Sequence, residues 1–195
     1  PDSAAVWLLQ PAAPDGDARA AIGAWRDALA EEGFQALPMD AESLGRDRLS
    51  GRPRAMLLPD TALVALSDSA VVAVTDYVRD GGLLLLCFDA GTRRTEDGAY
   101  SSLRSRFSQL AGINYALYSQ RGEAMFERDT LVLAVAGAQA LGIQPGKAVA
   151  SAPGIELKTH GYERLEYPHF STQGSVDGDV LARSAGGNAM IVRRR

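Results

Sequence analysis

The chain alternates short, continuously apolar segments with segments whose apolar residues recur at helical spacing. Apolar runs at residues 4–9, 34–39, 55–59 and 83–88 have the length and composition of parallel strands that are buried on both faces. Helical segments that start near residues 17, 67 and 101 follow the first, third and fourth of these runs. This alternation predicts an α/β fold with a doubly wound, mostly parallel sheet and helices on both of its faces.

Local signals mark where these helices begin and end. The first segment places apolar residues at spacings of four, three and four, and Gly33 stops it. Ser67 is positioned as the N-cap of the second helix, which ends at the glycine pair 81–82. The third helix is expected to run from Ser101 and to close at Gly112.

The pattern changes after Gly112. Residues 131–135 fit either a strand or part of a buried helix, because periodicity alone does not separate the two. Short apolar runs at 180–182 and 189–192 lie between glycine-rich turns. They predict extra strands near the C-terminus that finish the parallel sheet.

Composition narrows the classes of partner. A chain of 195 residues with 46% apolar residues suits a single domain over residues 1–195 that closes a core without disulfides or metals. The net charge of −4 gives no electrostatic case for nucleic acid, and no run approaches the ~20 apolar residues that span a membrane. The chain starts without Met and stops just after an apolar run, so we expect an excised piece of a longer chain.

Phosphate-binding motifs are missing from the sequence. The turn at residues 10–17 holds two prolines, which lack N–H groups, and two carboxylates, which repel phosphate. No cofactor is therefore expected. Asp60 could be a phosphoacceptor only with acidic residues for Mg²⁺ after the first strand, where Gln10 stands instead. A strand-end Asp that caps a turn is the favoured interpretation.

Cys87 is the one residue that suggests a nucleophile, with His160 and His169 as candidate bases. A nucleophile elbow needs the strand to break directly into a helix, whereas thirteen residues separate Cys87 from Ser101. We therefore predict a structural thiol inside a strand that is buried on both sides. One thiol also excludes metal sites that are built from several cysteines.

Polar residues follow the third and fourth apolar runs, where the carboxyl ends of parallel strands meet. Ligands of open α/β sheets bind at that edge. The expected ligand-binding residues are Asp60, Thr61, Asp89, Thr92 and Arg93. Arg93, Arg94, Arg104 and Arg106 could instead form a basic patch, for which pairing within the chain or solvation is favoured.

Three stretches carry a family resemblance: residues 57–60 (LLPD), 66–68 (LSD) and 76–84 (DYVRDGGLL). With the segment up to residue 113, they resemble the class I glutamine amidotransferase-like fold, a flavodoxin-like arrangement, in the form attached to carbohydrate-active enzymes. The trimerisation domain of family 42 beta-galactosidases is an example. In catalytic relatives the nucleophile stands about two residues before a glycine; counting from Gly91, that place is held by Asp89, and Cys87 falls short of it.

The resemblance implies a degenerate site and no catalytic residue. The implied role is a non-catalytic accessory or interaction domain of a larger polysaccharide-processing protein, in the periplasm or outside the cell rather than in the cytoplasm. Its expected partners are a neighbouring catalytic domain or further copies of itself, with a glycan as a candidate ligand. The alternative is a hydrolase or deacetylase-like enzyme that acts on a carbohydrate or amide at the strand-end edge.

Overall fold

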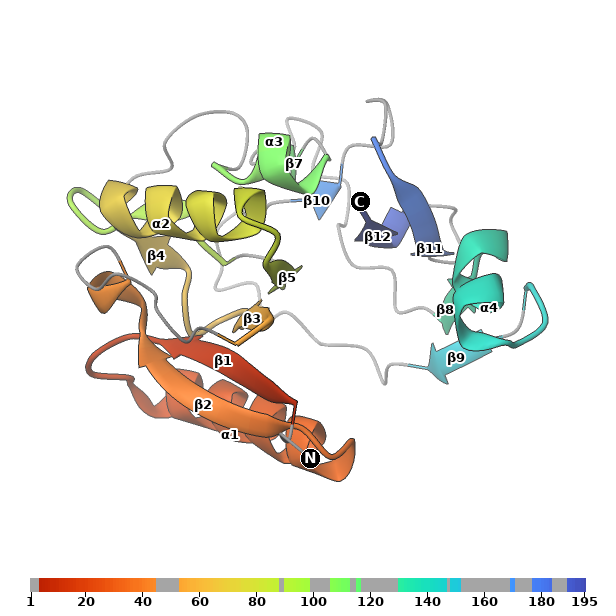
Figure 1. Ribbon diagram of the computed structural model, residues 1–195, viewed down its shortest axis with the longest axis horizontal. Helices are drawn as coiled ribbons and strands as arrows, with labels where there is room; N and C mark the ends of the chain where they lie inside the picture. The colour runs from red at the N-terminus through yellow and green to blue at the C-terminus, as the bar shows by residue number, and fades with distance from the viewer. Residues whose placement is uncertain are drawn as a thin grey trace, which may run out of the picture. The chain divides into compact units, whose positions relative to one another are not determined.

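The computed structural model describes ten stretches of the chain, and its arrangement is drawn in Figure 1. They are residues 4–44, 53–87, 90–98, 106–112, 115–116, 130–146, 148–151, 169–170, 177–183 and 189–195. The chain divides into two compact units, Pro1–Ser101 and Ser102–Arg195, which are described separately. The single domain over 1–195 stays a prediction.

A four-stranded parallel sheet organises the first unit. Its order is β2-β1-β3-β5, and every neighbouring pair is parallel. The strands are β1 (Ala5–Gln10), β2 (Gln35–Asp40), β3 (Ala55–Leu58) and β5 (Leu83–Leu86). They lie where the apolar runs predicted them, so the predicted α/β class and mostly parallel sheet are confirmed.

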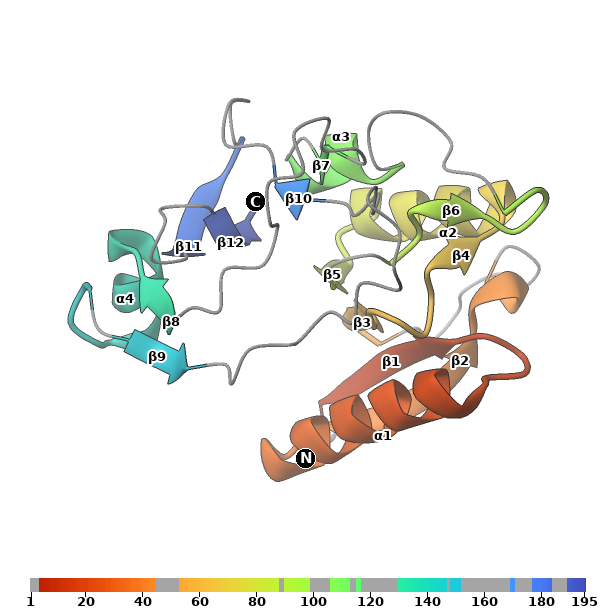
Figure 2. The ribbon, with the colours of Figure 1, turned by 180° about the vertical axis from the view of Figure 1, so that it is seen from behind.

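The helices α1 (Gly16–Glu31) and α2 (Asp68–Arg79) cover opposite faces of this sheet (Figures 1 and 2). On one face, Val6, Leu8 and Leu57 form a buried cluster, against which α1 packs Ile22, Trp25 and Leu29. Trp7 points to the other face, because neighbouring strand residues alternate. Its ring lies 6.1 Å from that of Tyr77 on α2, measured between ring centroids. The prediction of helices on both faces is therefore confirmed.

Side-chain caps fix the starts of both helices. The Asp15 carboxylate accepts from the Ala18 amide at 2.8 Å, and the Ser67 hydroxyl accepts from the Ala70 amide at 3.1 Å. Each cap satisfies one of the amides that a helix leaves unpaired at its start. The predicted cap at Ser67 is thus confirmed.

The turn from α2 into β5 depends on Gly82. Tyr77 is 1% exposed, and its hydroxyl donates to the Pro53 carbonyl at 3.0 Å. A Cβ at Gly82 would lie 2.3 Å from a carbon of the Tyr77 ring, so only glycine leaves room for it. The hydrogen bond from Tyr77 to Pro53 ties the end of α2 to the entry into β3.

Two short segments extend the sheet region beyond the ends of β3 and β5. They are β4 (Ala65–Leu66) and β6 (Arg93–Arg94), which pair in parallel. A short 3-10 helix at Ala41–Ser43 follows β2.

The fourth strand differs from its prediction. β5 lies at one end of the strand order, and Leu83 and Leu85 are 68% and 49% exposed. The expectation that this strand is buried on both sides is therefore wrong. The apolar run predicted burial, but an edge position leaves half of its side chains exposed.

The third helix is shorter than its prediction within the described residues. Residues 106–107 form a turn, α3 covers Ser108–Ala111, and Ser101 lies outside the described residues. Gly112 ends α3 with a φ of 68°, a conformation that glycine adopts without strain. The predicted end is confirmed, whereas helix over residues 106–107 is wrong.

The second unit contains an antiparallel sheet in the order β12-β11-β8-β9. Its strands are β8 (Thr130–Leu133), β9 (Ala148–Ser151), β11 (Asp179–Arg183) and β12 (Ala189–Arg193). Helix α4 (Val135–Leu141) follows β8, so the ambiguous run 131–135 is a strand that leads into a helix. A strand pair joins β7 (Tyr115–Ala116) to β10 (His169–Phe170). The late strands are confirmed, but their place in the parallel sheet is wrong, because they form a sheet of their own.

Candidate functional site

The carboxyl edge of the parallel sheet is the edge at which open α/β sheets bind their ligands. From β1, the chain first adds β2 on one side of β1. It then crosses to add β3 on the other side of β1, and β5 follows beyond β3. The direction of winding therefore reverses between β1 and β3. Open α/β sheets bind ligands at the carboxyl ends of the strands that flank such a point. Gln10 ends β1, and Asp60 follows β3.

Asp60 and Thr61 form a tight turn at this edge. The Ala62 amide donates to the Asp60 carbonyl at 2.5 Å, and Thr61 has a φ of 61°. A bond from the amide of residue i+2 to the carbonyl of residue i around a positive φ belongs to the classic γ-turn, which is rare and strained for a residue other than glycine. The chain therefore holds Thr61, which is exposed, in a conformation that its neighbours must enforce.

The Asp60 carboxylate is tied to α1. The indole N–H of Trp25 donates to Asp60 Oδ1, with 3.4 Å between the nitrogen and the oxygen. Trp25 reaches this edge because long side chains on a helix lean toward its N-terminus. The sequence showed Trp25 only as part of an apolar stripe, so this contact was missed.

The other predicted site residues lie elsewhere. Thr92 is 1% exposed and belongs to the interior, whereas Arg93 is exposed on β6, where its amide donates to the Val64 carbonyl at 2.9 Å. Asp89 lies outside the described residues. The structure thus places the half-buried Asp60 beside the exposed Thr61 and separates Thr92 from them. The ligand-binding role of the set stays a prediction.

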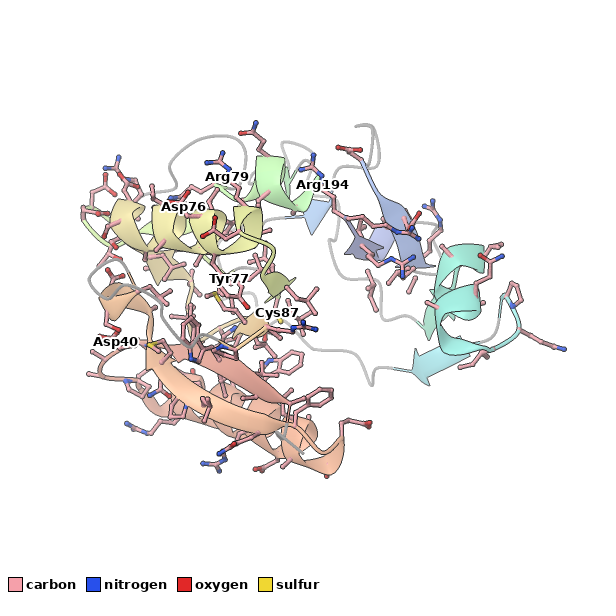
Figure 3. The ribbon with its side chains drawn as sticks, in the orientation of Figure 1. Asp40, Asp76, Tyr77, Arg79, Cys87 and Arg194 are labelled. Atoms are coloured by element: carbon pink, nitrogen blue, oxygen red, sulfur yellow. The ribbon has the colours of Figure 1, made fainter. Side chains whose placement is uncertain are left out.

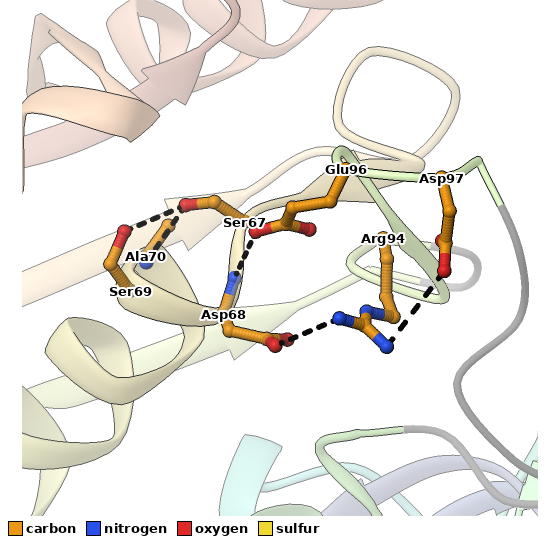
Figure 4. Close-up of polar contacts among 7 residues, drawn as sticks. All are labelled: Ser67, Asp68, Ser69, Ala70, Arg94, Glu96 and Asp97. Atoms are coloured by element: carbon orange, nitrogen blue, oxygen red, sulfur yellow. Dashed lines mark hydrogen bonds and ion pairs between the residues drawn. The ribbon is translucent and has the colours of Figure 1, made fainter.

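The start of α2 holds a polar cluster that sequence reasoning did not identify (Figure 4). The Asp68 amide donates to Glu96 Oε1 at 3.2 Å, and the Ser67 amide donates to Glu42 Oε1 at 3.1 Å. Arg94 pairs with Asp68 at 3.3 Å and with Asp97 at 3.8 Å. Carboxylates of the chain therefore occupy donors that would otherwise attract an anion.

This cluster also bears on the expected basic patch. Arg94 pairs within the chain, as favoured for that patch, whereas Arg104 lies outside the described residues. All partners in these pairs are at least about a third exposed, so each ion pair contributes little to the free energy of unfolding.

Cys87 lies one residue beyond β5 and is half-buried (Figure 3). Its side chain packs against the buried cluster of Val6, Leu8 and Leu57, and its amide donates to the Leu58 carbonyl at 3.0 Å. The predicted position inside a strand buried on both sides is therefore wrong. His160 and the side chain of His169, the candidate bases, lie outside what the structure describes.

The C-terminal arginines form ion pairs within the second unit. Arg193 donates to Asp179 at 2.8 Å across the β11–β12 register, and Arg195 lies 3.6 Å from the same carboxylate. The hydrogen bond from Arg193 lowers the pKa of Asp179, with smaller contributions from the charges of Arg193 and Arg195. Arg194 pairs with Asp177 at 2.8 Å and donates to carbonyls at the end of α3.

Two kinds of feature are not found in the described stretches. They contain no group of three or more His, Cys, Asp or Glu side chains that could hold a metal ion. Among the same residues, no helix has the length and apolar composition to cross a bilayer.

Comparisons with known proteins find similarity to solved structures. No family model matches the chain, and no curated protein matches it. The chain is similar to a beta-galactosidase from Bifidobacterium adolescentis, with 14% sequence identity and a TM-score of 0.43, over 94% of this chain and 78% of that chain. A similarity at this level does not assign an activity to the chain.

Proposed function

We propose that this chain is a non-catalytic accessory or interaction domain of a larger polysaccharide-processing protein. The resemblance of residues 55–113 to amidotransferase-like domains of carbohydrate-active enzymes supports the polysaccharide context. That resemblance also implies a degenerate site. No cofactor forms part of the proposal.

The setting of Cys87 carries the non-catalytic part of the proposal. Reactive cysteines are accessible, lie in electropositive surroundings and often begin a helix. Cys87 instead packs against Val6, Leu8 and Leu57, and its amide continues the hydrogen bonding between β5 and β3. Its position is explained by the sheet and needs no catalytic role.

The use of the strand-end polar groups by the fold gives further support. Asp60 accepts the indole N–H of Trp25, and Thr92 is enclosed in the interior. Residues that stabilise the sheet edge are less available to form a reaction centre. A glycan remains the proposed ligand at Asp60, Thr61, Asp89 and Arg93, whereas Thr92 is too enclosed to contact one. A neighbouring catalytic domain or another copy remains the proposed partner. The proposed location is periplasmic or extracellular.

A hydrolysis assay tests the proposal. The purified chain is incubated with aryl glycosides, acetylated sugars and simple amides, beside Cys87→Ala and Asp60→Asn as matched variants. We expect every rate to equal the rate without protein. Turnover by the wild-type chain that disappears in either variant would contradict the non-catalytic role and support the hydrolase alternative.

Chemical-shift mapping with oligosaccharides tests the ligand separately. The largest shifts are expected at Thr61, because this exposed turn lies at the strand-end edge, with further shifts at Asp89 and Arg93. Shifts elsewhere, with this turn unaffected, would overturn the proposed glycan site.

A further inference from the structure

Within the described part of the chain, strand β5 forms an edge of the parallel sheet. Strand β5 consists of four leucines, and in the described part of the chain only β3 pairs with it. Residues 81–87 carry no charge and no proline. Proteins normally protect an exposed edge with charges, prolines or bulges, because its unpaired backbone groups accept another strand.

The backbone directions show which groups this edge offers. The amides of Leu83 and Cys87 donate to the carbonyls of Arg54 and Leu58, so both point toward β3. Backbone groups alternate in direction along a strand, so the amides of Leu84 and Leu86 point away from β3. An added strand would find its hydrogen-bonding partners there.

Exposed side chains lie beside these groups. Leu83 and Leu85 are paired in register with Ala55 and Leu57, so they share the sheet face that α1 covers over the centre of the sheet. They are nevertheless 68% and 49% exposed. The apolar surface of the core therefore continues out to the edge.

We propose that the β5 edges of two copies of this chain pair antiparallel about a two-fold axis at Leu84, and this rests on the proposed interaction role. The axis would stand perpendicular to the sheet, and the pairing would join the two four-stranded sheets into one. Leu84 would exchange both backbone hydrogen bonds with Leu84 of the partner copy. Leu83 of each copy would oppose Leu85 of the other copy. These two pairs would gather four leucines on one face of the joined sheet.

Charge and area favour this occupant over a broad protein surface. A two-fold interface places a patch against itself, and an uncharged edge meets its copy without repulsion. Two part-exposed leucines fall far short of the roughly 800 Å² per partner in a standard interface. Backbone pairing must therefore supply much of the specificity, and the dimer is weak, with a Kd of about 10–100 µM.

Sedimentation velocity tests this pairing over about 5–500 µM protein, a concentration range that spans the expected Kd. The wild-type chain should shift from monomer to dimer. Leu85→Lys places a charge at the edge and should raise the Kd more than about tenfold. Leu83→Lys is a second variant at the more exposed position and should act alike. Val72→Lys changes a 58% exposed residue on α2 and should leave the Kd unchanged.

Three results would contradict the pairing. A chain that stays monomeric throughout the range overturns it, as does a dimer that persists in both edge variants while circular dichroism shows them folded. Edge amides that are protected in a monomer would mean that another part of the chain covers β5. A monomer without hydrolase activity overturns only the pairing, whereas Cys87-dependent turnover by a dimer overturns only the non-catalytic role.

Discussion

Strands β1 and β5 have similar apolar composition and opposite environments. β1 lies between β2 and β3, with Leu8 and Leu9 at 2% and 0% exposure, whereas β5 ends the strand order with Leu83 and Leu85 largely open. Position in the sheet, rather than the hydrophobicity of the strand, decides burial. An edge strand with the apolar composition of a central strand can pair with a strand of another molecule.

Truncating matched leucines gives the largest expected contrast. Leu8, Leu57 and Leu85 lie in register on one face of the sheet. Leu8→Ala should lower the free energy of unfolding by about 3 kcal/mol, because it leaves a cavity in the core. Leu85→Ala should cost under about 1 kcal/mol, since its side chain already meets solvent. Urea denaturation at low protein concentration measures both, and equal losses would contradict the difference between the strands.

Filling the space at Gly82 tests how α2 is fastened to the entry of β5. Gly82→Ala should cost about 2 kcal/mol, because its Cβ would collide with the buried Tyr77 ring. Gly23→Ala is the control, because nothing lies within 4 Å of a Cβ there and α1 should gain about 0.5–1 kcal/mol. In thermal unfolding, the melting temperature should fall in Gly82→Ala and rise in Gly23→Ala.

Removing the thiol beyond β5 has a smaller expected effect. Cys87→Ala should cost about 1 kcal/mol, because the side chain is half-buried against the core. The native thiol should react with iodoacetamide more slowly than the same thiol in unfolded protein. Reaction at the unfolded rate or faster would revive a nucleophilic role.

The smallest effect concerns an exposed pair in the second unit. Arg193 holds the pKa of Asp179 below its ordinary value. The pair's stabilisation is therefore present at neutral pH and is lost as pH falls below about 4. An NMR titration should show the pKa rising in Arg193→Gln, and rising less in Arg195→Gln, whose charge contributes less. Equal pKa values in all three proteins would contradict this pairing.

Features that depend on neighbouring residues could be predicted from the sequence. The buried run of β1 and the Ser67 cap of α2 each depend on a few adjacent residues, and both lie as expected. The edge position of β5 and the separate antiparallel sheet depend on which distant strands pair. Similar apolar runs form central strands, edge strands and strands of a separate sheet, so periodicity could not show which of these a run would become.

The candidate site shows the same division. Asp60 and Thr61 were predicted because they directly follow a strand. The Trp25 contact spans 35 residues, and the Glu96 contact with the Asp68 amide spans 28. Such contacts arise from tertiary packing and leave no local signal. The positive φ of Thr61 was equally hidden, since threonine rarely adopts it.

Hydrogen exchange at single backbone amides tests the assembly edge most directly. The amides of Leu84 and Leu86 should exchange quickly in dilute protein and become protected as concentration rises through the dimerisation range. The amides of Leu8 and Leu9 in central β1 should stay protected throughout. Protection of the β5 amides that is the same at every concentration, whether high or absent, would contradict an edge that pairs with a second copy.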